Sequence, residues 1–245
     1  MKKPFHRKTI FRHTGHIGDI IAFLPCYNML GGTKILIQDE VWMAPMSGYK
    51  YDSLEPLLKS QGIDVVFNGA TPCIDYDMSP WRECYQHTVS LIDCQARYVN
   101  LVDRNNGHLE VTDPWIKVEP DLLTKGRVII NRTHRYRNPN FPWSNVLKHF
   151  GDRALFIGTE QEHLSFLCEV GNIEHYKTES CLDVAKAIEG SEFFVGNQSS
   201  AFWIAAALHK PLLQEMDLVV TNSVVPFEGA MYPYDCKVEY DKLPK

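Results

Sequence analysis

Several kinds of function have no support in this sequence. The seven cysteines are an odd number and form no CxxC pair, which argues against a disulfide framework and against a zinc site. The ten histidines form no HExxH or comparable metal-ligand spacing. No apolar run approaches the roughly 20 residues that span a bilayer, and the basic start lacks the apolar segment of a signal peptide. We therefore predict a cytoplasmic protein with no membrane span and no bound metal.

Charge of neither sign is in large excess. The 25 lysines and arginines and the 30 acidic residues give a net charge of -5, which provides no general attraction to nucleic acid. A hydrophobic fraction of 44% with 22% charged residues is ordinary for a soluble globular protein. The length of 245 residues allows one large domain or two of about 100–150 residues each.

The first part of the chain alternates strand-like and helix-like runs. The centre of KILIQD is apolar throughout, as in buried parallel strands. Two glycines follow the first helical run and are typical of a helix end. The pattern predicts strands at 8–12, 34–39 and 63–67, helices at about 19–30 and 53–62, and, less clearly, one helix over 86–102.

The second part of the chain repeats one unit four times. It follows the segment 112–126, which has two prolines and neither periodicity, and which we interpret as an interdomain linker. Four repeats of strand then helix imply right-handed crossovers and a parallel sheet. We expect Ser144 to cap the first of these helices. The predicted strands are 127–131, 154–158, 173–176, 192–197 and 211–215, with helices at 142–151, 160–171, 181–190 and 199–210.

The sequence thus predicts an α/β protein with two domains. We place an acceptor-side domain at 1–121, a nucleotide-sugar-binding domain at 122–222 and a tail without strong pattern at 223–245. Ligands of open parallel sheets bind outside the carboxyl ends of the strands. The functional side chains are therefore expected in the loops that follow the strands.

The turn HTGHIGDIIAFLP follows the first predicted strand. It contains Gly15, His16, Gly18 and Asp19. A glycine-bearing turn before a helix offers N–H groups that suit an anion, although a carboxylate there would repel a phosphate. Asp19 is interpreted either as a helix cap, a place that Asp favours, or as a base beside a bound polar substrate. His16 is interpreted either as a loop residue or as a second catalytic residue.

Three arginines, Arg132, Arg135 and Arg137, come just after a buried strand of the second half. Their forked donors suit a diphosphate. The alternative is a surface loop whose arginines pair with Glu160 and Glu162.

Two further strand ends of the second half are polar. Gly158 is followed by a first helical turn with Glu162, which could bond a ribose or simply stabilise the helix. Gln198, Ser199 and Ser200 open another helix, whose free N–H groups favour an anion. Capping by Ser199 or Ser200, worth about 1 kcal/mol, is the alternative and is compatible with anion binding.

These residues resemble a family. GHIGDIIAFLP is similar to the glycine–aspartate turn of the heptosyltransferase-like glycosyltransferases, glycosyltransferase family 9. FIGTEQEH and the run from CLDVAKAIEG to AAALHKPLL resemble the family's acidic segment and donor-phosphate loop. The resemblance implies a GT-B fold, in which two Rossmann-like domains with parallel sheets face a central cleft. The second domain then holds the nucleotide-sugar and the first holds the acceptor.

The resemblance also implies roles. Asp19 becomes the base that takes the acceptor's proton, Ser199 and Ser200 fall in the phosphate loop, and Glu162 meets the nucleoside. Gln198 and Trp203 stand where the family has an aspartate and a histidine, and arginines stand where a lysine is common. The arginine loop also resembles the basic loop of fucosyltransferases that bind GDP-fucose. The chain is short for the family, as compact phage-encoded relatives are.

The expected function is an inverting, metal-independent glycosyltransferase with a nucleotide-diphosphate-sugar donor and no further cofactor. No DxD-like carboxylate pair stands at a strand end. The acceptor is left open between a glycan, a small molecule and a modified nucleic acid base. Two alternatives remain: a nucleotide-sugar binding protein that has lost its activity, and a nucleotide-sugar epimerase of GT-B form.

Overall fold

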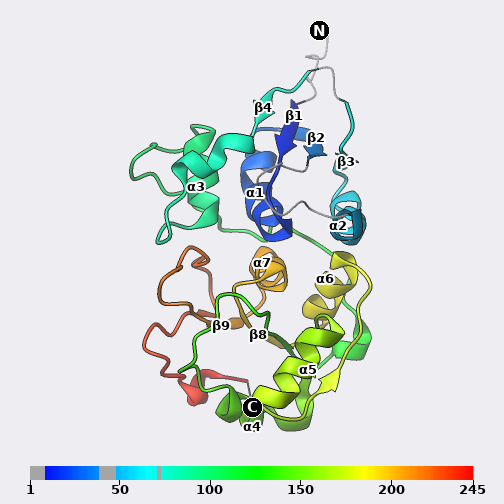
Figure 1. Ribbon diagram of the computed structural model, residues 1–245, viewed down its shortest axis with the longest axis vertical. Helices are drawn as coiled ribbons and strands as arrows, with labels where there is room; N and C mark the ends of the chain where they lie inside the picture. Colours follow the sequence, from blue (N-terminus) through cyan, green and yellow to red (C-terminus); the bar gives the residue numbers. More distant parts are fainter. Residues whose placement is uncertain (1–8, 39–47, 71–72, 245) are drawn as a thin grey trace. The chain divides into compact units, whose positions relative to one another are not determined.

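The computed structural model describes residues 9–38, 48–70 and 73–244 (Figure 1). The chain forms two compact units, the first of Met1–Tyr85 with Leu91–Val111 and the second of Gln86–Ser90 with Thr112–Lys245. Each unit holds one parallel sheet. Among the described residues, no helix is both long enough and apolar enough to cross a membrane.

The sheet of the first unit has four strands in the order β3-β2-β1-β4, and every pairing is parallel. Its centre is apolar because Phe11 and the run Ile35–Ile37 are buried, as the sequence of β2 predicts. The strands are β1 (Thr9–His13), β2 (Gly32–Ile37), β3 (Asp64–Phe67) and β4 (Tyr76–Asp77), and the helices are α1 (Ile17–Met29), α2 (Gly48–Ser60), the 3₁₀ helix η1 (Ser79–Cys84) and α3 (Leu91–Tyr98).

The single helix predicted over 86–102 is wrong. Only α3 is helical there, and Gln86–Ser90 belongs to the second unit. In that unit the N–H of Thr221 donates to the carbonyl of His87 at 2.8 Å. The segments β4 and η1 were not predicted because two and six residues are too short to show a period.

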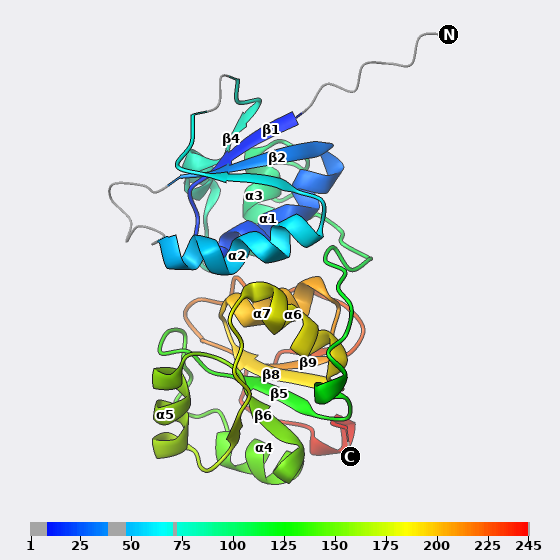
Figure 2. The same cartoon turned by 90° about the vertical axis from the view of Figure 1, so that its right-hand side faces the viewer.

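The second unit has a six-stranded parallel sheet in the order β10-β9-β8-β5-β6-β7, which confirms the predicted strand–helix repeats. Helices α6 and α7 cover one face of this sheet, and α4 and α5 cover the other (Figure 2). The strands are β5 (Val128–Asn131), β6 (Ala154–Phe156), β7 (Glu174–His175), β8 (Phe193–Asn197), β9 (Leu212–Glu215) and β10 (Ala230–Met231), and the helices are α4 (Trp143–Phe150), α5 (Glu160–Glu169), α6 (Cys181–Gly190) and α7 (Ser200–Ala207). Two short 3₁₀ helices, η2 (Leu122–Thr124) and η3 (Gly151–Arg153), precede β5 and β6, and a third, η4 (Tyr240–Lys242), lies near the chain end.

Ser144 does not cap its helix. Helix α4 begins at Trp143 with Pro142 as its N-cap, so Ser144 is already the second helical residue. Proline has no side-chain acceptor, so no side-chain hydrogen bond caps α4.

The predicted linker 112–126 is fixed to the second unit. The N–H groups of Trp115 and Ile116 both donate to the carbonyl of Ala207, at 2.9 and 3.3 Å. The N–H of Asp121 donates to the carbonyl of Lys186 at 2.9 Å. These bonds explain why the long segment of the second unit begins at Thr112, whereas the sequence placed its domain boundary between 121 and 122.

The segment 223–245, predicted as a tail, is part of the second unit's core as far as it is described. Its strand β10 pairs with β9. Leu243 is 3% exposed and belongs to the apolar cluster that also holds Phe150 and Phe193. The pattern is hard to detect because the strand has only two residues.

Candidate active site

The turn after β1 closes on itself through two hydrogen bonds. The N–H of Gly15 donates to Nδ1 of His13 at 2.9 Å, and the N–H of His16 donates to Oδ2 of Asp19 at 2.9 Å. A Cβ on Gly15 would lie 2.5 Å from Cβ of Asp19 and 2.6 Å from Cε1 of His13, so only glycine fits. Because these two N–H groups are already bonded, the turn has less to offer an anion than the sequence suggested.

Asp19 is not the N-cap of α1. His16 is the N-cap, Gly18 lies in the first turn and Asp19 is the third helical residue. From there its carboxylate reaches back to the N-cap N–H, as in a capping box. The predicted cap position is therefore wrong, while the predicted capping interaction is present.

The carboxylate of Asp19 has a second partner, Arg82, whose Nη2 lies 2.8 Å from Oδ2. Both bonds use the same oxygen, and Oδ1 accepts no hydrogen bond from the part of the chain that the structure describes. Asp19 is 9% exposed. A held carboxylate with one uncommitted oxygen can serve as a proton acceptor, so capping and catalysis do not exclude each other here.

Beneath Asp19 lies a buried histidine with a fixed tautomer. His13 is fully buried, and desolvation lowers its pKa, so its ring is neutral at pH 7. Its Nδ1 accepts from Gly15, so its Nε2 must carry the proton and donates to Oε1 of Gln95 at 3.0 Å. Gln95 in turn donates to the carbonyl of Asp19 at 3.0 Å. Gln95 and Arg82 were missed because they come from α3 and η1, far along the chain from the turn.

In the second unit, two of the three arginines are held by acidic residues. Arg132 is buried. It donates from Nε and Nη2 to the carboxylate of Glu215, at 2.9 and 3.0 Å, and from Nη1 to the carboxylate of Glu169, at 2.8 Å. Arg137 pairs with Glu169 at 2.7 Å. The pairing alternative is thus realised for two arginines, although the partners are Glu169 and Glu215 and not the predicted Glu160 and Glu162.

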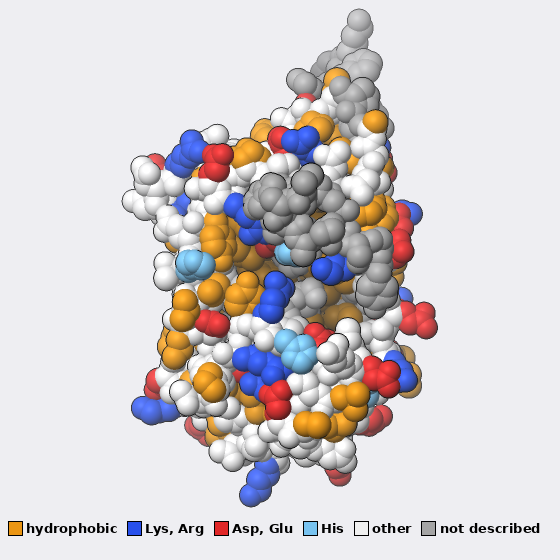
Figure 3. Space-filling model, in the orientation of Figure 1, with side chains coloured by type: hydrophobic (Ala, Val, Ile, Leu, Met, Phe, Trp, Pro, Cys, Tyr) orange, Lys and Arg blue, Asp and Glu red, His pale blue; other side chains and the backbone are white. Residues whose placement is uncertain are grey.

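Arg135 differs from its two neighbours. It is exposed, has no ion pair among the described residues, and lies with its guanidinium 5.3 Å from the ring centre of Tyr136. Tyr136 has φ +54°, a left-handed conformation that is unusual for a bulky residue. Figure 3 shows basic (blue), acidic (red) and histidine (pale-blue) side chains next to one another on the side of the second unit that it presents.

Asn197, at the end of β8, ties the arginine loop to the turn that opens α7. Its Oδ1 accepts the N–H of Thr133 at 2.9 Å, and its Nδ2 donates to the carbonyl of Arg135. The structure thereby brings the backbone of Arg135 close to the turn that holds Gln198–Ser200.

The turn itself combines capped and open N–H groups. Ser199 is the N-cap of α7: its Oγ accepts the N–H of Phe202 at 3.1 Å and donates to Oδ1 of Asn131 at 2.8 Å. Gln198 is buried and donates to Asn222. Ser200 is partly exposed, and neither its N–H nor that of Ala201 has a partner in the described ranges. Such unpartnered N–H groups at a helix N-terminus favour an anion.

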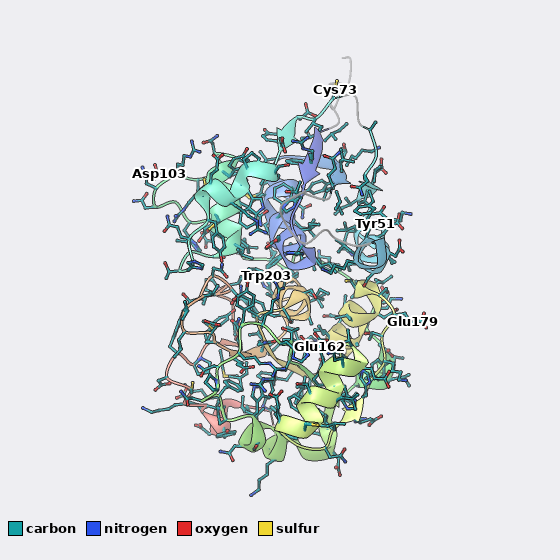
Figure 4. All side chains as sticks on the ribbon, in the orientation of Figure 1. Tyr51, Cys73, Asp103, Glu162, Glu179 and Trp203 are labelled. Atoms are coloured by element: carbon teal, nitrogen blue, oxygen red, sulfur yellow. The ribbon has the colours of Figure 1, made fainter. Side chains whose placement is uncertain are left out.

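Trp203 is labelled in Figure 4 on α7. It is 2% exposed and packs edge-on against Phe202. Its indole is part of the core, so it does not supply the polar contact that the family's histidine would make.

The acidic turn after β6 stabilises its own helix. Thr159 caps α5, and the N–H of Thr159 donates to Oε2 of Glu162 at 2.9 Å, which completes a capping box. Gly158 has φ +142°, and a Cβ there would lie 2.9 Å from this Glu162 oxygen. Glu160 is exposed in the first turn. Glu162, labelled in Figure 4, therefore fulfils the helix-stabilising alternative.

Asn131 joins three strand ends. Its Nδ2 donates to the carbonyl of Ile157, after β6, and its Oδ1 accepts from Ser199, after β8. Neither Asn131 nor Asn197 was predicted, although both are the last residue of a buried apolar strand, which is a usable sequence signal.

Within the described ranges, no group of three or more histidine, cysteine or acidic side chains is arranged to hold a metal ion.

No family model and no curated protein matches the sequence. Solved structures do match. WaaC, an E. coli heptosyltransferase solved with ADP, aligns with a TM-score of 0.53 and 12% identity over 92% of each chain. A glycosyl transferase family 9 protein from Veillonella parvula aligns with a TM-score of 0.52 and 12% identity, over 92% of this chain and 85% of that one.

TibC, an iron-containing dodecameric heptosyltransferase from enterotoxigenic E. coli, aligns with a TM-score of 0.53 and 16% identity in its complex with ADP-D-beta-D-heptose. The match covers 91% of this chain but only 61% of TibC. All three relatives are bacterial, and the phage origin stays a prediction. At these identities the likeness concerns the fold. The chain therefore has the GT-B fold of glycosyltransferases, in the form shared with family 9 heptosyltransferases.

Proposed function

We propose that the protein is a glycosyltransferase that moves a sugar from a nucleotide-diphosphate-sugar to an acceptor hydroxyl. One observation supports this most directly. In the second unit, Asn197 ties the backbone of the exposed, unpaired Arg135 to the turn where the N–H groups of Ser200 and Ala201 have no partner among the described residues. A cation and a helix N-terminus close together suit the diphosphate of a nucleotide donor.

The donor side stabilises the leaving group. As the sugar departs, negative charge grows on the diphosphate, and fixed N–H donors and a guanidinium lower the energy of that state. We assign this role to Arg135 and to the first turn of α7. Arg132 and Arg137 shape the loop, because Glu169 and Glu215 already neutralise them.

The acceptor side supplies the base. Oδ1 of Asp19 takes the proton from the acceptor hydroxyl as the hydroxyl oxygen bonds to the sugar's anomeric carbon and the diphosphate leaves. A single displacement of this kind inverts the anomeric centre. His16, on the same turn, is the second candidate for this proton. No step requires a metal, since arginine and N–H donors stabilise the leaving charge.

ADP-heptose is the first donor to test, because TibC was solved with it and WaaC with ADP. GDP-fucose is the second, because of the arginine-rich loop. Candidate acceptors are a glycan, a small molecule and a modified nucleic acid base.

One observation favours the alternative of a binding protein without activity. Asp19 already has two structural tasks, in the capping box and in the pair with Arg82. A carboxylate kept only for these tasks would leave the fold intact and the chemistry absent.

Two measurements separate these functions. A thermal-shift screen of nucleotides and nucleotide-sugars identifies the donor, since a ligand at 100 times its Kd adds about 2.7 kcal/mol of stability. Donor consumption is then followed with candidate acceptors, with and without EDTA. Transfer that survives EDTA supports the proposal, and loss on chelation contradicts metal independence. Binding without turnover on any acceptor favours the binding protein, and conversion of the donor's own sugar favours an epimerase.

A further inference from the structure

Arg82 is held on two sides. Its guanidinium lies 4.5 Å from the ring centre of Trp81, a fully buried residue of the same 3₁₀ helix. Its Nη2 donates to Oδ2 of Asp19 at 2.8 Å. No other hydrogen bond or ion pair involves the Arg82 side chain among the described residues. An arginine stacked on an aromatic ring has one plane in which its N–H groups can point, which makes its contact with Asp19 directional.

The bond from Arg82 restricts the Asp19 carboxylate more than the capping box alone would. The N–H of His16 holds Oδ2 of Asp19 from the helix side. A single bond leaves the carboxylate able to turn about its terminal torsion, which is broad in aspartate. The bond from Arg82 adds a second donor on the same oxygen. Together the two bonds fix which oxygen is engaged and which is left over.

We propose that Arg82 is a positioning residue that makes Oδ1 of Asp19 the oxygen that accepts the acceptor's proton. This inference rests on the proposed function of Asp19 as base. Arg82 is assigned no contact with the donor or with the reacting atoms, so its whole effect passes through Asp19.

The test compares four variants by steady-state kinetics with the donor that the screen identifies. R82Q should lower kcat by about 10²-fold, the size expected when a reacting group is misplaced by about 1 Å. The KM for the donor should stay unchanged. R82K should recover part of the loss, because it keeps the charge but not the planar fork. In a D19N background, R82Q should add no further loss, since both act through one carboxylate.

Arg12 offers a matched control. It forms a comparable, partly exposed ion pair with Asp77 in the same unit and does not touch Asp19. R12Q should keep kcat near that of the unmodified protein. Equal kcat values for R82Q and R12Q overturn the proposal, and so does a further loss from R82Q in the D19N background.

Failure of the proposed function gives a different result. If the unmodified protein transfers no sugar from any donor, that function is wrong, and a crystal structure of R82Q still tests the positioning role. An Asp19 side chain that turns away from its present rotamer supports the inference. An unchanged rotamer overturns it.

Discussion

The buried ion pair of Arg132 and Glu215 leads to a quantitative prediction. Glu215 is fully buried and accepts three hydrogen bonds, two from Arg132 and one from the N–H of Asn138 at 2.8 Å. Glu215→Gln removes the charge and leaves a buried guanidinium with only Glu169, whose side chain is 42% exposed. Breaking a buried pair from one side costs about 3–5 kcal/mol.

This loss is large enough to see in a melting curve. For 150–250 residues, 1 kcal/mol shifts Tm by about 2–4 °C, so the second unit's transition should fall by roughly 6–20 °C. The assay is thermal unfolding followed by circular dichroism. Glu192→Gln is the matched control, because Glu192 forms an exposed pair with Arg153 in the same unit. An exposed pair contributes about 0–1 kcal/mol, which predicts a shift below about 4 °C.

The double variant Arg132→Met with Glu215→Leu extends the test. Replacing both charges by apolar side chains leaves no buried charge unpaired, so it should destabilise the unit less than Glu215→Gln alone. The reasoning is refuted if Glu215→Gln melts within a degree or two of Glu192→Gln. It is also refuted if the double variant melts below Glu215→Gln.

Three further predictions concern the candidate site and its surroundings. Asp19→Asn should keep the fold and the nucleotide affinity, because Asn can still accept the N–H of His16, while kcat falls about 10²–10⁴-fold; near-normal turnover would move the base to His16 or His13. Arg135→Ala should weaken ADP binding about 10- to 150-fold by calorimetry, the loss of one charge-assisted bond of about 1.5–3 kcal/mol; unchanged affinity would place the diphosphate elsewhere. Burial lowers the pKa of His13, so the unfolded chain binds a proton there that the folded protein does not. Stability should therefore fall as pH drops below about 6.5, by up to about 1.4 kcal/mol per unit, in urea titrations between pH 7.5 and 5. His13→Gln should flatten this slope only in part, because burial also lowers the pKa of His209.

The sequence predicts the sheets better than the site. Buried strands such as β5 and β8 are apolar throughout, and the helices between them alternate regularly, so the order of elements can be read from the pattern. Gly15 and the Ser199 cap contact residues within four positions along the chain, so local spacing predicts them.

Partners that arrive from distant segments could not be predicted. Arg82 and Gln95 reach Asp19 from more than 60 residues away, and Glu215 reaches Arg132 from 83 residues away. Only the fold brings these groups together. The same limit explains why Glu169 and Glu215 were not predicted as the partners of Arg132 and Arg137.

The order in which the second unit closes has a consequence for biosynthesis. Its edge strand β10 and the core residue Leu243 follow all its other strands in the sequence, and its segment Gln86–Ser90 is made long before its partner Thr221. A ribosome must therefore release the segment through Leu243 before this core can be completed. Until then the emerging polypeptide exposes apolar strands, and a product that stops before Ala230 should be recognised by chaperones and proteases as unfolded.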